Sequence, residues 1–352
     1  MRPDTTPPEP SDVPDAPDAT DASDASGSGA GAHGDAGAGS GAGRVAVART
    51  EAGAGTGAEV LAVLTHGELT VRGRIPGASN AVLFCGVEHE GRLLDCVYKP
   101  VAGERPLWDF PDGNLARREV AAYEVSRATG WDLVPPTVLR DGPYGEGMCQ
   151  LWIEAAEEDG EAGAAGEGSE GSEGAQGHDE SAGDAEGPGE GVTPLLALVE
   201  GDEPGEGWKA IGFVDVGEDR TALLVHADDP RLRRLAVLDA VINNGDRKGG
   251  HLLTDATGGL HAIDHGVTFN ADDKLRTLLW GWAGEELTAE AVAVLRGLAS
   301  SLADGAPLAV RLAELITEAE LDALRKRTEA LLSSGRHPLP SGDWPAIPWP
   351  PV

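Results

Sequence analysis

The chain has 352 residues, with 60 acidic against 27 basic side chains, a formal net charge of -33, 50 glycines and only 4% aromatic residues. This balance argues against a general nucleic-acid binder and against a protein that docks on an anionic membrane surface, because both need basic patches. The acidic charge is concentrated: residues 1–57 carry nine acids and three bases, and residues 154–190 carry thirteen acids and no base. The remainder is a moderately acidic chain, long enough for one large core or two small ones.

Two segments are predicted to lie outside the folded core. Residues 1–57 form a Pro/Asp-rich and then Gly/Ala-rich tail that we expect to be disordered, and residues 155–191 form an acidic Gly/Glu low-complexity insertion. The N-terminus lacks the apolar stretch of a signal peptide, and no apolar run approaches the length of a membrane span. Cys85, Cys96 and Cys149 are widely spaced and favour reduced thiols, so we expect a cytoplasmic protein without a transmembrane segment.

The first ordered block, residues 58–154, predicts a small antiparallel sheet with a single helix on it. The segment from Leu115 to Thr129 is typical of a helix, and Gly130 follows it at the position where helices commonly end. Alternating or continuous apolar runs indicate five strands. These predicted strands are 68–75, 81–87, 93–100, 134–139 and 147–153.

The second ordered block, residues 192–340, is predicted to be mostly helical. Apolar periodicity indicates helices over 230–243, 287–302 and 308–333. Between the first two, the turn residues Thr257-Gly258-Gly259 predict a β-hairpin over 251–264. The Pro/Trp-rich tail, 341–352, is expected to be extended and either laid on the surface or free.

Polar residues that suit phosphate chemistry gather around this hairpin. Pairing about the turn would place His251 and Asp264 side by side at its open end, and the loop carrying Asp246 and Lys248 reaches the same end. Two acids, a histidine and a lysine in one place suit a metal-bound phosphate and a hydroxyl to be activated. The plainer interpretation is that Asn-Asn-Gly-Asp merely ends a helix and that Gly-Gly is an ordinary loop.

Upstream residues add to this pattern. Lys99 ends an apolar strand, which holds it in place and suits a point-charge contact with phosphates. Glu119, on the following helix, would pair with Lys99; Glu124 is the competitor, and both glutamates could instead be solvated. Residues 77–80 form a turn whose backbone N–H groups could cover a phosphate, although one glycine makes a weak glycine loop.

Together these motifs resemble the protein-kinase-like superfamily, and within it the phosphatidylinositol 3- and 4-kinase-like branch. The resemblance is carried by Val-Tyr-Lys on the third strand, the helical glutamate, Asp-Arg-Lys-x-x-His and Ile-Asp-x-Gly, and it covers about 62–335. Val-Tyr-Lys-Pro, Arg-Arg-Glu-Val-Ala-Ala-Tyr-Glu-Val and Leu-Trp-Gly-Trp-Ala-Gly are similar to an actinobacterial family of phosphatidylinositol-kinase-like proteins of unassigned function. The resemblance implies a two-lobed α+β fold, with an N-lobe over 58–154 and a C-lobe over 192–340.

The resemblance also implies a role for each site residue. Asp246 would orient the acceptor hydroxyl and take its proton, Lys248 would neutralise the transferring phosphoryl group, and Asp264 would bind Mg²⁺. In the implied nucleotide site, Lys99 would contact the α- and β-phosphates of ATP, with Glu119 as its partner. Gly77, Ser79 and Asn80 would cover the phosphates. The stretch from Gln150 to Ile153, which includes Trp152, would form the hinge that binds adenine.

His251 departs from the family pattern, which usually has asparagine as the second metal ligand at this position. Mg²⁺ prefers oxygen, whereas imidazole suits Mn²⁺ or softer ions. Three interpretations stay open: His251 binds the metal and favours Mn²⁺, His251 only supports Asp264 through a hydrogen bond, or the site is degraded.

The function predicted from the sequence is therefore ATP-dependent phosphoryl transfer to a hydroxyl on a small molecule, a protein or an inositol lipid. Two alternatives remain. One is a nucleotide-binding pseudokinase that acts as a scaffold. The other is transfer of AMP by the same fold with the nucleotide reversed.

Overall fold

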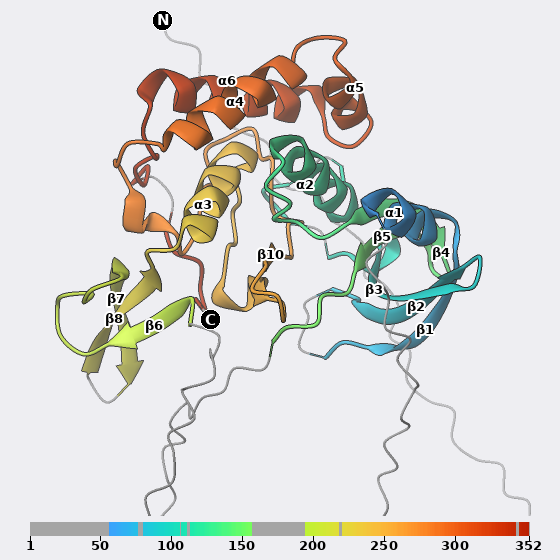
Figure 1. Ribbon diagram of the computed structural model, residues 1–352, viewed down its shortest axis with the longest axis horizontal. Helices are drawn as coiled ribbons and strands as arrows, with labels where there is room; N and C mark the ends of the chain where they lie inside the picture. Colours follow the sequence, from blue (N-terminus) through green and yellow to red (C-terminus); the bar gives the residue numbers. More distant parts are fainter. Residues whose placement is uncertain are drawn as a thin grey trace, which may run out of the picture. The chain divides into compact units, whose positions relative to one another are not determined.

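The N-terminal part of the described chain is a five-stranded antiparallel sheet with two helices packed against it (Figure 1). The computed structural model describes residues 56–76, 80–105, 107–110, 113–156, 194–217, 220–342 and 345–351. The strands are β1 (Glu68–Arg74), β2 (Leu83–His89), β3 (Arg92–Pro100), β4 (Thr137–Gly142) and β5 (Gly145–Leu151), and the helices are α1 (Gly57–His66) and α2 (Leu115–Thr129). The strand order is β1-β2-β3-β5-β4, and α2 lies in the connection between β3 and β4, after the short helix η1 (Val101–Gly103).

The centre of this sheet explains where Lys99 lies. β3 pairs with β2 on one side and β5 on the other, with Cys85 opposite Cys96 and Lys99 opposite Met148. Because side chains alternate between the two faces of a strand, the face that buries Cys96 and Tyr98 packs beneath α1, and Lys99 points to the opposite face. All three cysteines are buried and free.

Helix α1 was not predicted. It begins at Thr56, whose side chain forms a reciprocal capping box with Glu59, and it buries Val63 and Leu64 against the sheet. The Thr-x-x-Glu signature was present in the sequence, but it adjoins the Gly/Ala-rich stretch that was assigned to the tail. The predicted tail therefore ends earlier than expected, and residues 1–55 lie outside the described part of the chain.

Helix α2 matches its predicted bounds because both of its ends are capped. Asn114 accepts a hydrogen bond from the N–H of Arg117, and Gly130 adopts φ 70°, the left-handed conformation that glycine reaches without steric cost. Glu104, in the connection from β3, accepts the N–H groups of Leu115 and Ala116 at 2.9 and 2.8 Å. These contacts hold the first turn of α2 against the connection from β3.

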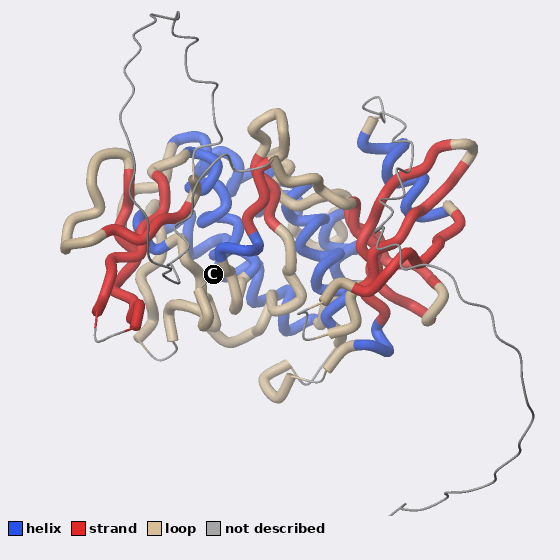
Figure 2. The backbone as a smooth tube through the Cα atoms, turned by 90° about the horizontal axis from the view of Figure 1, so that it is seen from below, coloured by secondary structure: helices blue, strands red, loops and turns tan. Residues whose placement is uncertain are grey.

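The C-terminal part is built on four helices: α3 (Pro230–Ile242), α4 (Ala289–Ser301), α5 (Pro307–Ala313) and α6 (Glu318–Ser334). In Figure 2, which shows the whole chain, most of the helices lie between groups of strands at the two ends of the molecule. The predicted hairpin is present as β9 (Leu252–Thr254) and β10 (Leu260–Ala262), preceded by the short helix η2 (Gly249–His251). The helix predicted over 308–333 is two helices, since Thr317 caps a new helix with Glu320 in a capping box.

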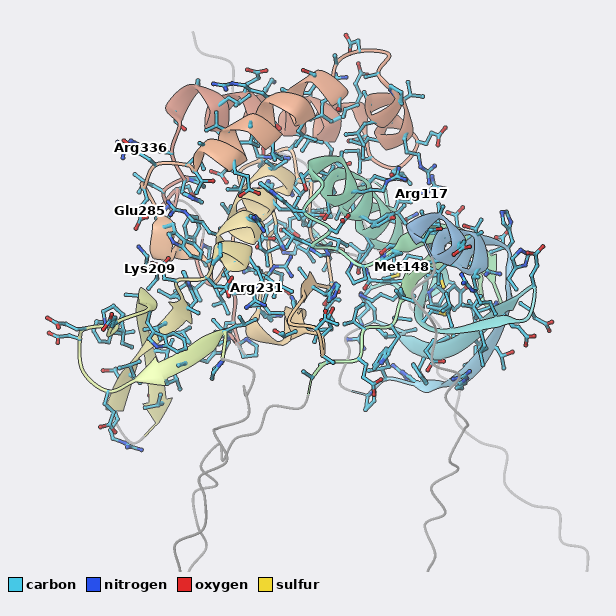
Figure 3. The ribbon with its side chains drawn as sticks, in the orientation of Figure 1. Arg117, Met148, Lys209, Arg231, Glu285 and Arg336 are labelled. Carbon is cyan, nitrogen blue, oxygen red and sulfur yellow. The ribbon has the colours of Figure 1, made fainter. Side chains whose placement is uncertain are left out.

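A three-stranded sheet in this part was missed. It consists of β6 (Leu196–Val199), β7 (Trp208–Gly217) and β8 (Arg220–Ala227) in the order β6-β8-β7. Lys209 of β7 pairs with Glu285 at 2.6 Å, which ties the sheet to the segment that follows the short helix η3 (Trp280–Trp282); Figure 3 labels both residues. The description of the C-lobe as mostly helical therefore omitted a sheet, although the α+β arrangement, with a small antiparallel sheet in the N-terminal part and helices in the C-terminal part, is confirmed.

Candidate active site

Lys99 joins the two lobes through an ion pair with each. Its ammonium lies 2.7 Å from Oε1 of Glu119 on α2 and 2.8 Å from Oδ1 of Asp264, just after β10. The partner on α2 is thus Glu119, as predicted, while the competitor Glu124 pairs with Arg127 and Arg311. Burial alone would lower the pKa of Lys99, but the carboxylates of Asp264 and Glu119 raise it above its usual value.

The carboxylate of Glu119 is almost fully buried (1% exposed). Its second oxygen accepts the backbone N–H of His265 at 2.8 Å, so one side chain of α2 contacts both β3 and the segment after β10. Burial raises the pKa of Glu119, and the ammonium of Lys99 opposes that rise. Helix α2 is itself fixed to α6 by a buried ion pair of 2.6 Å between Arg118 and Glu320.

Asp264 is held in an unusual conformation and stays ionised. Its φ is 62°, in the left-handed region that few residues other than glycine adopt, and such residues cluster at functional sites. The Lys99 ammonium holds the pKa of Asp264 well below its usual range. About half of the Asp264 side-chain surface is exposed (49%), which leaves carboxylate oxygen accessible to a ligand.

His251 lies beside Asp264, as the hairpin predicts. Its Nε2 is 3.4 Å from Oδ2 of Asp264, and its Nδ1 faces the N–H of Lys248 at the same distance. Burial lowers the pKa of His251 to about 4, so the ring is neutral near pH 7. With Nδ1 facing a donor, Nε2 is left to carry the hydrogen toward Asp264, which favours the interpretation that His251 supports Asp264.

Asp246 and Lys248 pair with each other across one residue, with Nζ 2.8 Å from Oδ2. The N–H of Asp246 donates to Oδ1 of Asn244, which fixes the loop after α3. Arg276 was not predicted to be near the site, yet its guanidinium lies 3.7 Å from Oδ1 of Asp246 and donates to the carbonyl of Gly245 at 2.7 Å. Nothing in the sequence marked Arg276, because thirty residues separate it from Asp246.

Arg247, between these two residues, is fully buried and was also missed. It makes a two-pronged ion pair with Asp239 of α3, with Nε 3.0 Å from Oδ2 and Nη2 3.0 Å from Oδ1. It also donates to the carbonyl of Ile263 at 3.0 Å and lies 2.6 Å from Nε2 of His265. Asp239 stands on the buried face of a helix, and a charged residue there was the available signal for a buried partner.

One small cavity gathers most of the predicted residues. It has a volume of about 300 Å³. Its lining includes Asn80, Lys99, Glu119, Asp246, Lys248 and Asp264. Asn80 accepts the N–H of Arg105 at 2.9 Å, while Gly77 and Ser79 lie outside the described residues.

The predicted hinge needs a correction. Gln150 lies in the interior of the sheet, paired with β3 and β4, and its side-chain amide donates to Thr137 at 2.8 Å. The N–H of Trp152 donates to the carbonyl of Asp95 at 3.0 Å, and its ring packs edge-on against Phe84. These groups are therefore engaged within the sheet, because β5 pairs with β3 up to Leu151 and Trp152 bonds to β3 just beyond it.

The metal-binding capacity of this junction rests on few protein ligands. Within the described ranges, no group of three or more His, Cys, Asp or Glu side chains is arranged to hold a metal ion. Asp264 with His251 beside it suits the kind of site in which Mg²⁺ takes one or two carboxylates and completes its shell with phosphate oxygens and water. The residues present thus fit a metal that arrives with a nucleotide.

The C-terminal segment lies against the loop that carries Lys248. The carbonyl of Pro351 accepts the N–H of Gly249 at 2.8 Å. The carbonyl of Ala346 accepts two donors, the N–H of Thr277 at 3.0 Å and the indole N–H of Trp280 at 2.8 Å. Residues 345–351 were expected to be extended and laid on the surface or free, whereas this segment bends repeatedly and buries Pro348 and Pro351.

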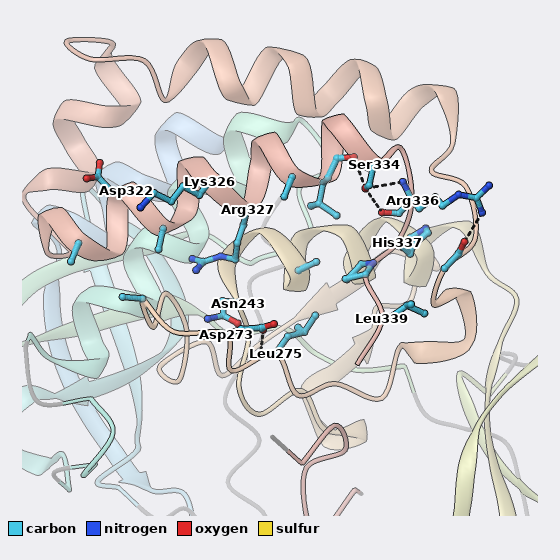
Figure 4. Close-up of a pocket in the computed structure, with 18 residues that line it drawn as sticks. Asn243, Asp273, Leu275, Asp322, Lys326, Arg327, Ser334, Arg336, His337 and Leu339 are labelled. Atoms are coloured by element: carbon cyan, nitrogen blue, oxygen red, sulfur yellow. Dashed lines mark hydrogen bonds between the residues drawn. The ribbon is translucent and has the colours of Figure 1, made fainter. Parts of the chain in front are cut away.

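A larger cavity of about 850 Å³ lies elsewhere, between α3 and α6 (Figure 4). It contains none of the predicted site residues. Arg327, which burial brings to a pKa of about 10, points from α6 to the carbonyls of Val241 and Asn270. Volume alone would favour this cavity, but the convergence of acids and lysines favours the smaller one.

No helix in the described part of the chain is both long and apolar enough to cross a membrane.

Comparison with known proteins assigns the chain to a family. Over 291 residues it is 46% identical to "Protein Rv2133c" of Mycobacterium tuberculosis, covering 82% of this chain and 94% of that protein. The chain belongs to the Rv2133c family. No family model matches it.

Solved structures resemble this member of the Rv2133c family more distantly. The Golgi casein kinase with Mn/ADP bound is 12% identical, with 84% of this chain and 80% of that chain covered and a TM-score of 0.44. Hydra Fam20 with sugar is 13% identical (79% and 87% covered, TM-score 0.42), and the Helicobacter pylori proinflammatory kinase CtkA is 11% identical (78% and 94% covered, TM-score 0.36). These scores assign no chemistry to the chain, which has to be argued from its own residues.

Proposed function

We propose that the chain is an ATP-dependent phosphotransferase that transfers the γ-phosphoryl group to a hydroxyl, with phosphatidylinositol 3-/4-kinase-like machinery. One observation carries the proposal: Lys99 bridges Glu119 at 2.7 Å and Asp264 at 2.8 Å. A cation fixed by two carboxylates from separate elements, at the wall of a cavity that also contains Asp246 and Lys248, suits phosphate recognition.

Each residue has a role in this proposal. ATP with Mg²⁺ or Mn²⁺ supplies the phosphoryl group and neutralises its charge. Lys99 contacts the α- and β-phosphates, and Glu119 holds the lysine in place. Asp246 orients the acceptor hydroxyl and accepts its proton, and Lys248 stabilises charge on the transferring group. Asp264 binds the metal, and His251 orients Asp264.

The phosphates and the adenine of the nucleotide are assigned to different parts of the chain. Asn80, with Gly77 and Ser79 before it, covers the phosphates through backbone N–H groups. Because Gln150 and Trp152 are engaged in the sheet, we assign adenine to the backbone after β5, at Ile153 and Glu154. The free, buried cysteines fit a reducing compartment, and we place the protein in the cytoplasm.

The decisive experiment pairs binding with turnover. The purified protein is titrated with ATP by calorimetry in Mg²⁺ and in Mn²⁺, and transfer of γ-label from ATP is followed in parallel. We expect binding with at least one metal, and Asp246→Asn should retain binding while losing transfer about 10²- to 10⁴-fold. Absence of nucleotide binding with both metals would contradict the proposal.

The same assay separates the two alternatives. Label from the α-position on the product would indicate AMP transfer. Binding without turnover, unchanged by Asp246→Asn, would indicate a pseudokinase scaffold. Loss of activity in Mg²⁺ with recovery in Mn²⁺ would indicate that His251 is itself a metal ligand.

A further inference from the structure

The cavity at Lys99 is small for a site that has to hold two reactants. Its volume of about 300 Å³ is at the lower end of the range of ligand-binding pockets. The residues proposed to contact phosphate, Lys99, Lys248 and Asp264, line the same space. Once the transferring phosphoryl group occupies part of it, little room is left around Asp246 for the acceptor.

One side of this cavity is a wall made by the connection between β3 and α2. Glu104, Arg105 and Leu107 contribute lining from this connection, and Leu115 and Ala116 contribute from the first turn of α2. The wall is attached to the N-lobe on both sides of the cavity. Arg105 donates its N–H to Asn80 at 2.9 Å, and the carboxylate of Glu104 caps the start of α2.

The same wall is also attached to the C-lobe. The side-chain amide of Asn270 donates to the carbonyl of Asp109 at 2.8 Å. The ammonium of Lys274 lies 5.6 Å from the ring centre of Trp108, a cation–π contact. Both partners belong to the segment that runs from Asp264 toward Arg276, so the wall contacts both lobes.

We infer that the acceptor is a small, free hydroxyl compound, no larger than a hexose or a cyclitol with a small anionic substituent, an inference that rests on the proposed function. An extended polypeptide would have to run through the contacts of Asp109 and Trp108 with the C-lobe. A lipid head group in a bilayer would have to reach Asp246 past the same wall, in a protein of net charge -33. Arg105 at the cavity suits the anionic substituent.

The transfer balances without any further reactant. The acceptor oxygen forms a bond to the γ-phosphorus as the bond from that phosphorus to the β,γ-bridging oxygen breaks, and ADP leaves with the electron pair. The hydroxyl proton goes to Asp246 and then to solvent. The products are a phosphate monoester of the small acceptor, ADP and one proton.

The first test is the chemical identity of the labelled product. The full chain is incubated with γ-labelled ATP and three fractions of one bacterial extract: metabolites below about 1 kDa, proteins and lipids in vesicles. We expect label in the metabolite fraction alone. Label in proteins or lipids without any in metabolites overturns the inference, and so does release of γ-phosphate with no label in any fraction, since water would then be the acceptor. Failure to bind nucleotide would instead refute the proposed function, and the inference with it.

The second test narrows the cavity at the wall. Leu107→Trp should raise the KM for the labelled metabolite about tenfold or more relative to the KM for ATP, because the larger side chain takes space in the cavity that Asp246 also lines. Leu93→Trp makes the same change at an exposed position of β3 and should leave both constants as they are. If Leu107→Trp does not fold, Leu107→Phe is the graded substitute. An acceptor KM that is unchanged in a folded Leu107 variant overturns the inference.

Discussion

Two ionic clusters meet at the junction of the lobes, and they differ in how completely their charges are satisfied. In the closed cluster, Arg247 and Asp239 are both 0% exposed, and the guanidinium also contacts His265. In the open cluster, Lys99 holds Glu119 and Asp264, of which Asp264 is 49% exposed. The closed cluster leaves no charge for a ligand and positions the loop, whereas the open cluster presents an ionised carboxylate and a fixed cation to the cavity.

The largest expected effect is on stability, in the closed cluster. Arg247→Met leaves the carboxylate of Asp239 buried without its partner, so we expect a loss of about 3–5 kcal/mol in the free energy of unfolding. Asp264→Asn in the open cluster should change it by less than about 1 kcal/mol, because that side chain is half exposed. Urea unfolding of both variants measures the difference. Equal losses in the two variants would remove the distinction between the clusters.

The next largest effect is on turnover, in the open cluster. Glu119→Gln removes the charge that holds Lys99, and we expect kcat to fall about 10- to 100-fold because the lysine loses its position. Glu124→Gln is the matched control on the same helix, since Glu124 pairs only with surface arginines of the described chain. A steady-state assay of γ-label transfer compares them, and similar rates for the two variants would argue against the role of Glu119.

Removing the C-terminal segment tests whether its contact with the loop that carries Lys248 holds that loop in place. Ending the chain after Gly342 removes the carbonyl of Pro351 that accepts the N–H of Gly249, two residues before His251. We expect kcat to fall about tenfold, with the Kd for ATP changed much less, because the loop rather than the nucleotide contacts would lose its position. Trp349→Ala, at a side chain that is 74% exposed, is the control. A truncated chain with full kcat would show that the segment is dispensable.

The smallest expected effect is the response to acid, which involves neither cluster directly. His226 and His337 both contact the ring of Trp282 in the core, and burial lowers both pKa values, that of His337 to about 4. The unfolded chain binds these protons near pH 6.5, whereas the folded chain does not, so stability falls as the pH drops from about 6.5 toward 4.

For His337 the expected loss between pH 7 and pH 5 is about 1 kcal/mol, allowing for solvent screening. Urea unfolding at the two pH values measures this loss. His337→Gln should reduce the dependence on pH. A dependence unaffected by His337→Gln would place the titrating groups elsewhere, at His226 or in the clusters themselves.

Local sequence signals were sufficient to predict most of the helices and strands on which the candidate site residues lie. Helix α2 has the predicted bounds because Asn114 and Gly130 cap it locally, and the hairpin follows from its turn at 257–259. Elements whose stability comes from partners were harder to predict. The three-stranded sheet was missed although the Gly/Pro-rich stretch 200–207 is a turn signal between β6 and β7, because β6 has only four residues and no apolar periodicity of its own. The helix predicted over 308–333 is divided at Thr317, where a cap competes with apolar periodicity.

The composition suggested a solvated acidic chain, yet the sequence alone indicated a moderately acidic core and the residues Lys99, Asp246 and Asp264 to which the proposed function assigns the chemistry. It could do so because strand alternation, helix caps and turn residues act over short distances. Only the tertiary structure decided which glutamate pairs with Lys99, that Arg247 is buried against Asp239, and that the segment before α2 forms a wall bridging the cavity. These contacts join residues 8 to 161 positions apart, and their geometry depends on how separate elements pack rather than on any local pattern.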